Sequence, residues 1–354
     1  MDFTNSLIIW YLQNKRDLPW RNTTNPYPIW LSEIILQQTR VAQGTPYFLS
    51  FVNTFPTVFD LAAANEEQVL KLWQGLGYYS RARNLHKTAQ YVADELSGVF
   101  PGSYKDLLKL KGVGEYTAAA IASFSYNEAV PVVDGNVFRV LSRYFDLETD
   151  ISLASAKKEF AALAFELMPK DTQGKTEPSE ANPALFNQAI MEFGALQCVP
   201  KSPDCSVCIF NTSCAALQKK KVDQLPVNTK KLKVRNRFFN YLVVNDEKEN
   251  TIIQKRTEKG IWHNLYEFPL IETEKEEDFD FISKKIQKDF FQCNEIISIG
   301  ECNEKSIIHK LSHQHLNIKF WKVNIKDTIE NGIDSATLKT FPFPIVIFNF
   351  IEMN

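Results

Sequence analysis

The sequence of 354 residues lacks an excess of charge of either sign and lacks any long apolar run. Its 40 basic and 42 acidic residues give a formal net charge of −2, so the whole-chain charge does not mark it as a nucleic-acid binder. No apolar run approaches the roughly 20 residues that span a bilayer, and residues 341–351 contain two prolines. Asp2 and Asn5 interrupt a signal-peptide profile at the N-terminus. We therefore expect a cytoplasmic protein, by default a monomer, with no membrane role.

Charge is nevertheless uneven along the chain. Residues 219–237 carry eight basic side chains and one acid, whereas residues 272–280 are strongly acidic. A run of like charge is most often a solvated linker, so the basic run supports phosphate contact only weakly. No internal repeat is visible, and a chain of this length is expected to form two packed units.

The first unit is predicted to be an all-α region of residues 1–218, because apolar residues recur there at helical spacing. Asn65 followed by Gln68, for example, is typical of a helix start. A basic linker follows at residues 219–236. The pattern changes in residues 237–354, where short β-branched and aromatic runs predict an α+β domain. Strands are expected at residues 238–244, 251–253 and 316–321, and a helix is expected at residues 279–291.

Six cysteines occur, and four of them follow the spacing C-x6-C-x2-C-x5-C. Four thiols this close, in a chain without an export signal, predict a metal site rather than disulfides. Sulfur ligands suit either an iron–sulfur cluster or tetrahedral zinc, and the ligand types do not separate the two. For Cys293 and Cys302, in the second domain, buried free thiols are the simpler interpretation. The four candidate ligands are Cys198, Cys205, Cys208 and Cys214.

This spacing, placed directly after an apolar helix at residues 186–194, resembles the iron–sulfur loop of the endonuclease III and MutY glycosylases. The resemblance implies that the four cysteines hold a [4Fe-4S] cluster. It also implies a mainly α fold, with a two-lobed helix–hairpin–helix glycosylase region followed by an α+β MutT/Nudix-like domain.

Gly112 and Gly114 stand between two helical patterns, where they allow a tight turn and a close approach of the backbone. The next helix begins near Glu115, and its free amides can hold a phosphate oxygen. Alone, this pattern also fits a plain helix corner. Residues 110–143 resemble the hairpin and aspartate segment of the DNA glycosylase superfamily, which implies that Asp134 is the catalytic aspartate. An aspartate here would also cap the following helix.

Tyr116 stands where the lyase branch of this superfamily carries a lysine that forms a Schiff base with the sugar. No amine is supplied at this position. We therefore expect a monofunctional glycosylase, and the MutY branch carries the same substitution.

Glu33 is the one acid in the apolar, helical segment of residues 30–40. Burial beside bulky aliphatic side chains disfavours an ionised carboxylate, so the pKa of Glu33 should rise into the range in which it donates a proton. A helical acid is more often simply solvated. The segment resembles the MutY signature helix, however, which implies that Glu33 is the general acid.

Two carboxylates can share the cleavage of an N-glycosidic bond. Glu33 would protonate adenine, at N7 by analogy with the family, because adenine leaves poorly as an anion. Asp134 would stabilise the oxocarbenium-like sugar or trap it covalently before water completes the hydrolysis. The resemblance places Tyr116 and Asn136 in the same site.

A stacked base must be flipped out of the duplex before it can be cut, and the gap must be filled. Residues 76–85 resemble the wedge loop of the family, which implies that Tyr78 intercalates and that Arg81 contacts phosphate. Without the resemblance, Tyr78 fits a core position equally well. The family also assigns Gln38 and Thr39 to the opposite base, and Trp20 and Arg21 to the adenine pocket.

Residues 260–269 resemble the opening of a MutT-like Nudix fold. The magnesium-binding box of the Nudix hydrolases should follow, but the acidic residues 272–280 lack its arginine, spacing and glycine. We therefore expect a domain that binds and does not hydrolyse. In MutY proteins it reads 8-oxoguanine through a Phe-Ser-His loop. This chain has Leu311, Ser312 and His313, so the serine and the histidine match.

The predicted function is therefore base-excision repair: hydrolysis of the N-glycosidic bond of adenine mispaired with 8-oxoguanine or guanine in double-stranded DNA. An endonuclease III-like pyrimidine glycosylase with lyase activity is one alternative, which Tyr116 opposes. The other is a non-catalytic iron–sulfur DNA-binding protein, in which Glu33 and Asp134 would be dispensable.

Overall fold

The computed structural model describes residues 2–169, 182–230, 233–290 and 296–353. Its contacts divide the chain into two compact units. The helical unit contains residues 1–63 and 84–230, and the sheet unit contains residues 64–83 and 231–354. Segment 64–83 thus belongs with residues far along the chain, although its sequence pattern is helical. None of the helices in the described ranges is long and apolar enough to cross a bilayer.

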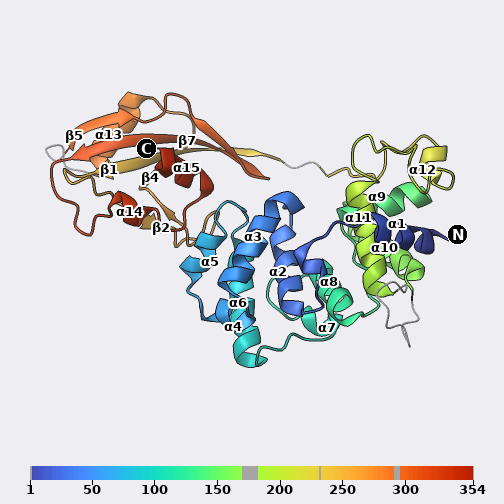
Figure 1. The fold of residues 1–354 in the computed structure, drawn as a ribbon. Helices are drawn as coiled ribbons and strands as arrows, with labels where there is room; N and C mark the ends of the chain where they lie inside the picture. Colours follow the sequence, from blue (N-terminus) through green and yellow to red (C-terminus); the bar gives the residue numbers. More distant parts are fainter. Residues whose placement is uncertain (1, 170–181, 231–232, 291–295, 354) are drawn as a thin grey trace. The chain divides into compact units, whose positions relative to one another are not determined.

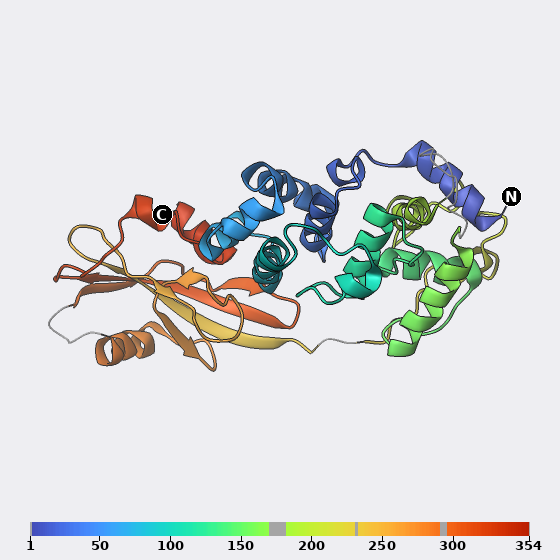
Figure 2. The same ribbon diagram turned by 90° about the horizontal axis from the view of Figure 1, so that it is seen from below.

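The helical unit consists of two groups of helices that meet where α8 (Glu115–Tyr126) contacts α11 (Pro183–Leu196) (Figures 1 and 2). In the first group, α2 (Pro26–Leu36) packs against α8 and α3 (Val41–Thr54). In the second, α1 (Phe3–Asn14) and α9 (Gly135–Phe145) pack against α11. The other helices are η1 (Pro19–Arg21), α4 (Val58–Ala63), α6 (Ser80–Glu95), α7 (Tyr104–Leu107), α10 (Ala154–Leu167) and α12 (Ala215–Gln218).

Aromatic rings fill the core of the second group. The rings of Phe3 and Phe210 stack with centroids 4.9 Å apart, and Phe193 meets both Trp10 and Phe210 edge to face. Phe210 lies inside the cysteine segment, and Phe193 lies just before it. The core that joins these helices therefore also packs against the cysteine loop.

The prediction of one helix over residues 30–40 is wrong at its C-terminal end, because α2 ends at Leu36. Gln38 has a φ of 56°, the left-handed conformation that commonly ends a helix. The Thr39 amide then donates to the Leu36 carbonyl over 3.1 Å. Gln38 and Thr39 therefore lie in the turn between α2 and α3, with Gln38 exposed.

The sheet unit is built on β1 (Arg235–Asn245) and β7 (Gln314–Ile325), which pair in parallel. The strand order is β4-β1-β7-β5, and β6 also pairs with β7. Apolar residues of α13 (Phe279–Asp289) pack on one face, and Phe350 of α15 (Ile345–Met353) stacks on Phe320 at the other (Figure 2). The remaining elements are β2 (Gln254–Lys255), β3 (Tyr266–Glu267), β4 (Leu270–Thr273), β5 (Ile296–Glu301), β6 (Ile307–Lys310) and α14 (Ser335–Leu338).

Two predictions for this unit need correction or restriction. Residues 251–253 do not form a strand, and Thr251 makes only single bridges to Asn245 and Ile333. β4 pairs with residues 238–241 of β1, and the chain at Thr251 meets β1 only at its last residue, so the pairing does not extend through residues 252 and 253. The helix expected to end at Phe291 is α13, which ends at Asp289. Phe291 and Cys293 lie outside the described residues.

Segment 64–83 is fixed to the sheet unit by specific bonds. It carries α5 (Glu66–Leu72), which opens with the predicted capping box of Asn65 and Gln68. Lys71 Nζ donates to the Lys339 carbonyl over 2.6 Å and to the Phe341 carbonyl over 3.1 Å. The Glu67 carboxylate accepts from the Tyr266 hydroxyl over 2.7 Å.

The glycines between α7 and α8 are not equivalent, and they offer a matched test of the hairpin. Gly112 has a φ of +75°, and a Cβ there would lie 2.7 Å from Cβ of Asn84. Gly114 has an ordinary φ and open space around it. We expect Gly112→Ala to cost about 2 kcal/mol, because a left-handed alanine is strained and the contact adds to that strain. Gly114→Ala should leave the melting temperature nearly unchanged. Equal melting temperatures in thermal denaturation would contradict this account.

Candidate active site

The helical unit contains a cavity of about 560 Å³ that opens between its two groups of helices. Side chains from both groups line it, so the fold brings together residues far apart in the sequence. Seven residues selected from the sequence are among them: Trp20, Arg21, Glu33, Thr39, Tyr116, Asp134 and Asn136.

Glu33 lies in the middle of α2 and is 7% exposed. Burial raises the pKa of Glu33 to about 7, and the negative charge of Asp134 adds to the rise. The hydroxyl of Tyr116 and the charge of Arg21 act in the opposite direction. The carboxyl group therefore exchanges a proton near neutral pH, as the sequence analysis expected of a general acid.

Asp134 caps the N-terminus of α9. One of its oxygens accepts from the backbone amides of Asn136 and Val137, both over 2.8 Å, and the other accepts from Asn136 Nδ2 over 2.7 Å. Burial raises the pKa of Asp134, and these hydrogen bonds oppose the rise. The predicted capping role and the proposed catalytic role are thus compatible in one residue, because the bonds fix the carboxylate at the cavity wall.

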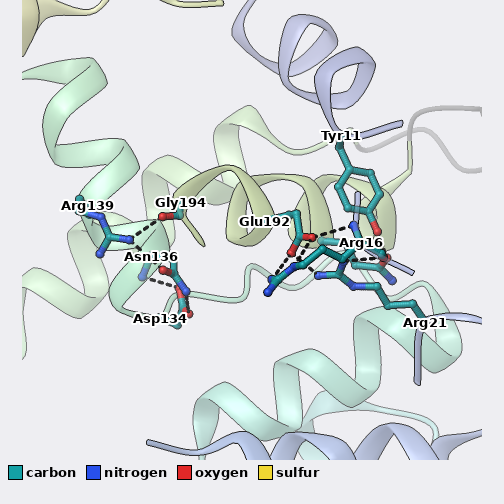
Figure 3. Close-up of polar contacts among 9 residues, drawn as sticks. Tyr11, Arg16, Arg21, Asp134, Asn136, Arg139, Glu192 and Gly194 are labelled. Atoms are coloured by element: carbon teal, nitrogen blue, oxygen red, sulfur yellow. Dashed lines mark hydrogen bonds and ion pairs between the residues drawn. The ribbon is translucent and has the colours of Figure 1, made fainter. Parts of the chain in front are cut away.

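Arg139, one turn further along α9, connects this cap to Gly194 of α11 (Figure 3) and to the cysteine loop. It donates to Asn136 Oδ1 over 2.9 Å, to the Gly194 carbonyl over 2.6 Å and to the Cys198 carbonyl over 2.6 Å. A Cβ at Gly194 would lie 2.7 Å from Cβ of Asn136, so only glycine allows this approach of α11 to α9. The position of Asn136 therefore depends on both helices.

A second polar network, drawn in Figure 3, contains Arg16, Arg21 and Glu192, which line the same cavity. The carboxylate of Glu192, on α11, accepts from Arg16 and from Arg21 over 2.6 and 2.7 Å. The Arg21 guanidinium also lies over the Tyr11 ring, 5.7 Å from its centroid. The Tyr11 hydroxyl donates to Gln188 over 2.6 Å.

Arg16, Arg139 and Glu192 also line the cavity, although they were not predicted from the sequence. A signal for Glu192 was present, because it is the only acid in the apolar segment of residues 186–194. The reasoning that selected Glu33 as a lone acid among aliphatic residues applies to it equally. Arg16 and Arg139 carry no comparable signal, since surface helices commonly contain arginine.

The four predicted cysteine ligands line one hollow, together with Arg143, Phe193 and Phe210. Burial raises the pKa of Cys208 to about 11, and burial and the neighbouring thiols also raise the pKa of Cys205 and of Cys214. The four can ionise together only around a cationic centre.

Arg143 of α9 holds the start of this cysteine segment. It donates to the Val199 carbonyl over 2.8 Å, to the Pro200 carbonyl over 3.1 Å and to Cys198 Sγ over 3.4 Å. Within the described residues, no three Cys, His, Asp or Glu side chains converge on a single-ion position.

Thr39 lines the cavity, whereas Gln38 points away from the protein core as an exposed side chain. The hairpin glycines Gly112 and Gly114 precede α8, whose first turn receives no side-chain cap from Gly114. The amides at this helix start are therefore available to an anion such as a phosphate oxygen.

The remaining predicted residues belong to the sheet unit. Tyr78 is 46% exposed, whereas its neighbour Tyr79 is 6% exposed, so only the second of the two is a core aromatic. Tyr78 has a φ of 48°, in the left-handed region. Arg81 supports the loop: its guanidinium lies over the Tyr78 and Trp73 rings and donates to the Gly77 carbonyl over 3.3 Å.

Ser312 and His313 are exposed at the turn between β6 and β7. Ser312 Oγ and His313 Nδ1 are 3.3 Å apart, and the Leu311 amide donates to the Gln314 carbonyl over 2.8 Å. Leu311 is half-buried, whereas the side chains of Ser312 and His313 are exposed and accessible to a ligand.

Comparison with known proteins gives the class to which this architecture belongs. Residues 31–168 match the family described as "HhH-GPD superfamily base excision DNA repair protein", and residues 240–353 match the NUDIX domain. A solved structure described as a thermostable thymine-DNA glycosylase is 29% identical, with a TM-score of 0.54, over 61% of this chain and 95% of that chain. An endonuclease III–DNA complex, 21% identical over 61% of this chain and 94% of that chain, shares the fold, with a TM-score of 0.51. The chain is thus a helix–hairpin–helix DNA glycosylase, and the predicted fold class is confirmed.

Curated relatives define the family more narrowly. The adenine DNA glycosylase of Buchnera aphidicola subsp. Acyrthosiphon pisum (strain APS) is 34% identical over 89% of this chain and 85% of the relative. The Homo sapiens adenine DNA glycosylase is 42% identical over 63% of this chain and 41% of that longer protein. The chain belongs to the adenine DNA glycosylase family.

The Arg139 connection predicts a strong effect away from the cavity centre. We expect Arg139→Ala to slow adenine excision about 100-fold, because a displacement of roughly 1 Å in a reacting group can cost that much. Arg139→Lys keeps the charge but not the forked donor, so its excision rate should lie between those of the wild type and Arg139→Ala. Single-turnover excision assays on both variants, with melting curves as a folding control, test this. A folded Arg139→Ala protein with the wild-type rate would show that Asn136 does not depend on Arg139.

The raised pKa of Glu33 predicts a pH-dependent stability difference. The unfolded carboxyl ionises near its ordinary pKa of 4.5, whereas the folded one stays protonated to about pH 7, so ionisation costs the folded state stability as pH rises between these values. Glu33→Gln removes this cost, worth roughly 3 kcal/mol above pH 7. The melting temperature of the variant, relative to that of the wild type, should therefore rise as pH increases from 4.5 to 7.5. The exposed Glu95→Gln is the control, and a difference independent of pH would refute the assignment.

Proposed function

We propose that this enzyme hydrolyses the N-glycosidic bond of adenine mispaired with 8-oxoguanine or guanine, without cutting the DNA backbone. The observation that carries the proposal is the pair of acids in one cavity. Glu33 has a pKa of about 7, whereas Asp134 has a carboxylate held by three hydrogen bonds. Their environments suit one acid to donate a proton and the other to act as an anion.

The two acids divide the chemistry. Glu33 in its protonated form donates to N7 of the flipped adenine, so the base leaves as a neutral molecule. Asp134, fixed at the start of α9, stabilises the positive charge that develops on the sugar, and water completes the hydrolysis. Asn136 holds Asp134, and the Tyr116 hydroxyl bonds to Glu33. Tyr116 offers no amine to the sugar, which supports a monofunctional reaction.

We assign a [4Fe-4S] cluster to Cys198, Cys205, Cys208 and Cys214. The donor set fits it, because the four thiols share one hollow and thiolate ligands hold iron–sulfur clusters. When bound, the cluster supplies the cationic centre that keeps the four thiolates ionised. Arg143 and Arg139 then tie the folded loop to α9 through their bonds to its carbonyl groups.

Recognition of the mispair is assigned to side chains of both units. In the helical unit, Trp20 and Arg21 line the adenine pocket, and Gln38 and Thr39 meet the opposite base. In the sheet unit, Tyr78 fills the gap in the duplex, and Ser312 and His313 read the lesion. This assignment is supported by the exposure of Gln38, Tyr78, Ser312 and His313. We further propose that the protein acts as a cytoplasmic monomer, with its catalytic region ending at residue 218 and the reading domain beginning at residue 237.

The decisive experiment is a single-turnover assay on a duplex with one adenine opposite 8-oxoguanine, scored for strand breaks with and without alkali. We expect breaks at the adenine only after alkali. Asp134→Asn should lower the rate at least 100-fold, on the order of a lost catalytic group, while asparagine keeps the helix cap. The exposed Asp94→Asn is the matched control.

Three results would overturn the proposal. Breaks without alkali would indicate a lyase. Full activity of Asp134→Asn would remove Asp134 from the reaction. No excision by the wild type, despite binding to the duplex, would indicate a non-catalytic DNA-binding protein.

A further inference from the structure

Glu192 is a fully buried carboxylate to which the proposed reaction gives no role. Its side chain is 1% exposed, and both of its oxygens are occupied. Oε1 accepts from the Arg16 backbone amide over 3.0 Å and from Arg16 Nε over 2.8 Å. Oε2 accepts from Arg16 Nη2 over 2.6 Å and from Arg21 Nη2 over 2.7 Å. Burial alone would raise the pKa of Glu192, but these bonds lower it to about 2, so the group is an anion at every working pH.

Arg16, Arg21 and Glu192 thus form a group of two cations and one anion at the wall of the cavity that contains Glu33. The positive charge of Arg21 already lowers the pKa of Glu33. Without the anion, both arginines would face the cavity uncompensated. Such a charge would favour the ionised form of Glu33, which cannot donate a proton.

We propose that Glu192 is a positioning residue, whose buried carboxylate holds Arg16 and Arg21 as a pair on the cavity wall and cancels charge that would otherwise deprotonate Glu33. The inference rests on the proposed function, because it needs Glu33 to be the general acid. Glu192 itself accepts from the two arginines (Figure 3), and it acts on Glu33 through them. Glu192 thereby allows Arg16 and Arg21, whose guanidinium groups can donate to a flipped nucleobase, to lie near Glu33 while Glu33 stays protonated.

The other titratable and charged groups around Glu33 come from several elements. The Tyr116 hydroxyl is on α8, Asp134 is at the start of α9, and Arg40 and Arg139 also line the cavity. None of them contacts Glu192, whose hydrogen bonds in the described structure all go to Arg16 and Arg21. Changes at Glu192 therefore alter the arginine pair and leave the other contacts of Glu33 in place.

The test is the pH profile of the single-turnover excision rate, from pH 5 to 9, at saturating enzyme on a duplex with adenine opposite 8-oxoguanine. In the wild type the rate should fall as pH rises through about 7, because Glu33 loses its proton there. In Glu192→Gln this fall should move to lower pH by about one unit, the usual effect of one uncompensated charge nearby. The rate at pH 8 should then drop about tenfold, with a change of less than about threefold at pH 5.5.

Two further variants keep the test decisive if Glu192→Gln does not fold. Arg21→Gln removes a cation, so the fall should move to higher pH, whatever its effect on the maximal rate. The double variant Glu192→Gln with Arg21→Gln removes one charge of each sign, so its profile should return toward that of the wild type. Glu192→Asp keeps the charge and should keep the wild-type pH dependence even where the rate is lower.

The outcomes separate this inference from the proposed function. A wild type without excision, or a Glu33→Gln protein that keeps both its rate and its pH dependence, contradicts the proposed function. Normal excision by the wild type, combined with an unchanged pH profile in both Glu192→Gln and Arg21→Gln, overturns the inference alone. A uniform loss of rate at all pH values in Glu192→Gln also overturns it, since that result indicates a purely structural role.

Discussion

The approach of α11 to the start of α9 is the constraint on which the rest of the helical unit depends. Gly194 permits it, because any side chain there would overlap Asn136. The close contact lets one arginine, Arg139, reach the cap of α9, the end of α11 and the Cys198 carbonyl at once. The proposed catalytic aspartate and the cysteine loop are therefore parts of one hydrogen-bonded structure rather than two sites that happen to share a domain.

Buried charge is handled differently at the three acids of the cavity. Glu33 is buried and has no cationic partner in direct contact among the described residues, so it stays protonated to near neutral pH. Asp134 is stabilised by backbone and amide donors and carries its charge without a salt bridge. Glu192 is paired with two arginines and is always ionised. The same chemical group thus acquires three protonation behaviours within one cavity, and the partners alone decide which.

Much of this arrangement could be predicted from the sequence. The cysteine spacing, the hairpin glycines and the lone acid in an apolar helix are local patterns, and the fold brings Glu33, Tyr116, Asp134 and Asn136 to one cavity as expected. The end of α2 at Leu36 could not be read in the same way, because a left-handed Gln38 has no compositional signature. Arg139 could not be predicted from the sequence because its partners are mostly backbone carbonyl groups, which every residue carries. The strand expected at residues 251–253 is reduced to single bridges from Thr251 to Asn245 and Ile333, and such tertiary pairing has no local sequence signal.

The assignment of residues 64–83 to the sheet unit has a consequence for how the molecule can be divided. The chain leaves the helical unit after residue 63, returns at residue 84, and leaves it again after residue 230, so three covalent crossings join the units. A fragment that stops at residue 230 would retain α5 but lose the backbone carbonyls of Lys339 and Phe341 to which Lys71 is bonded. It would also leave the buried Trp73 and Leu76 without the unit that covers them. Sequence matches give two modules in tandem, at residues 31–168 and 240–353, but segment 64–83, which lies inside the first match, packs with the last third of the chain.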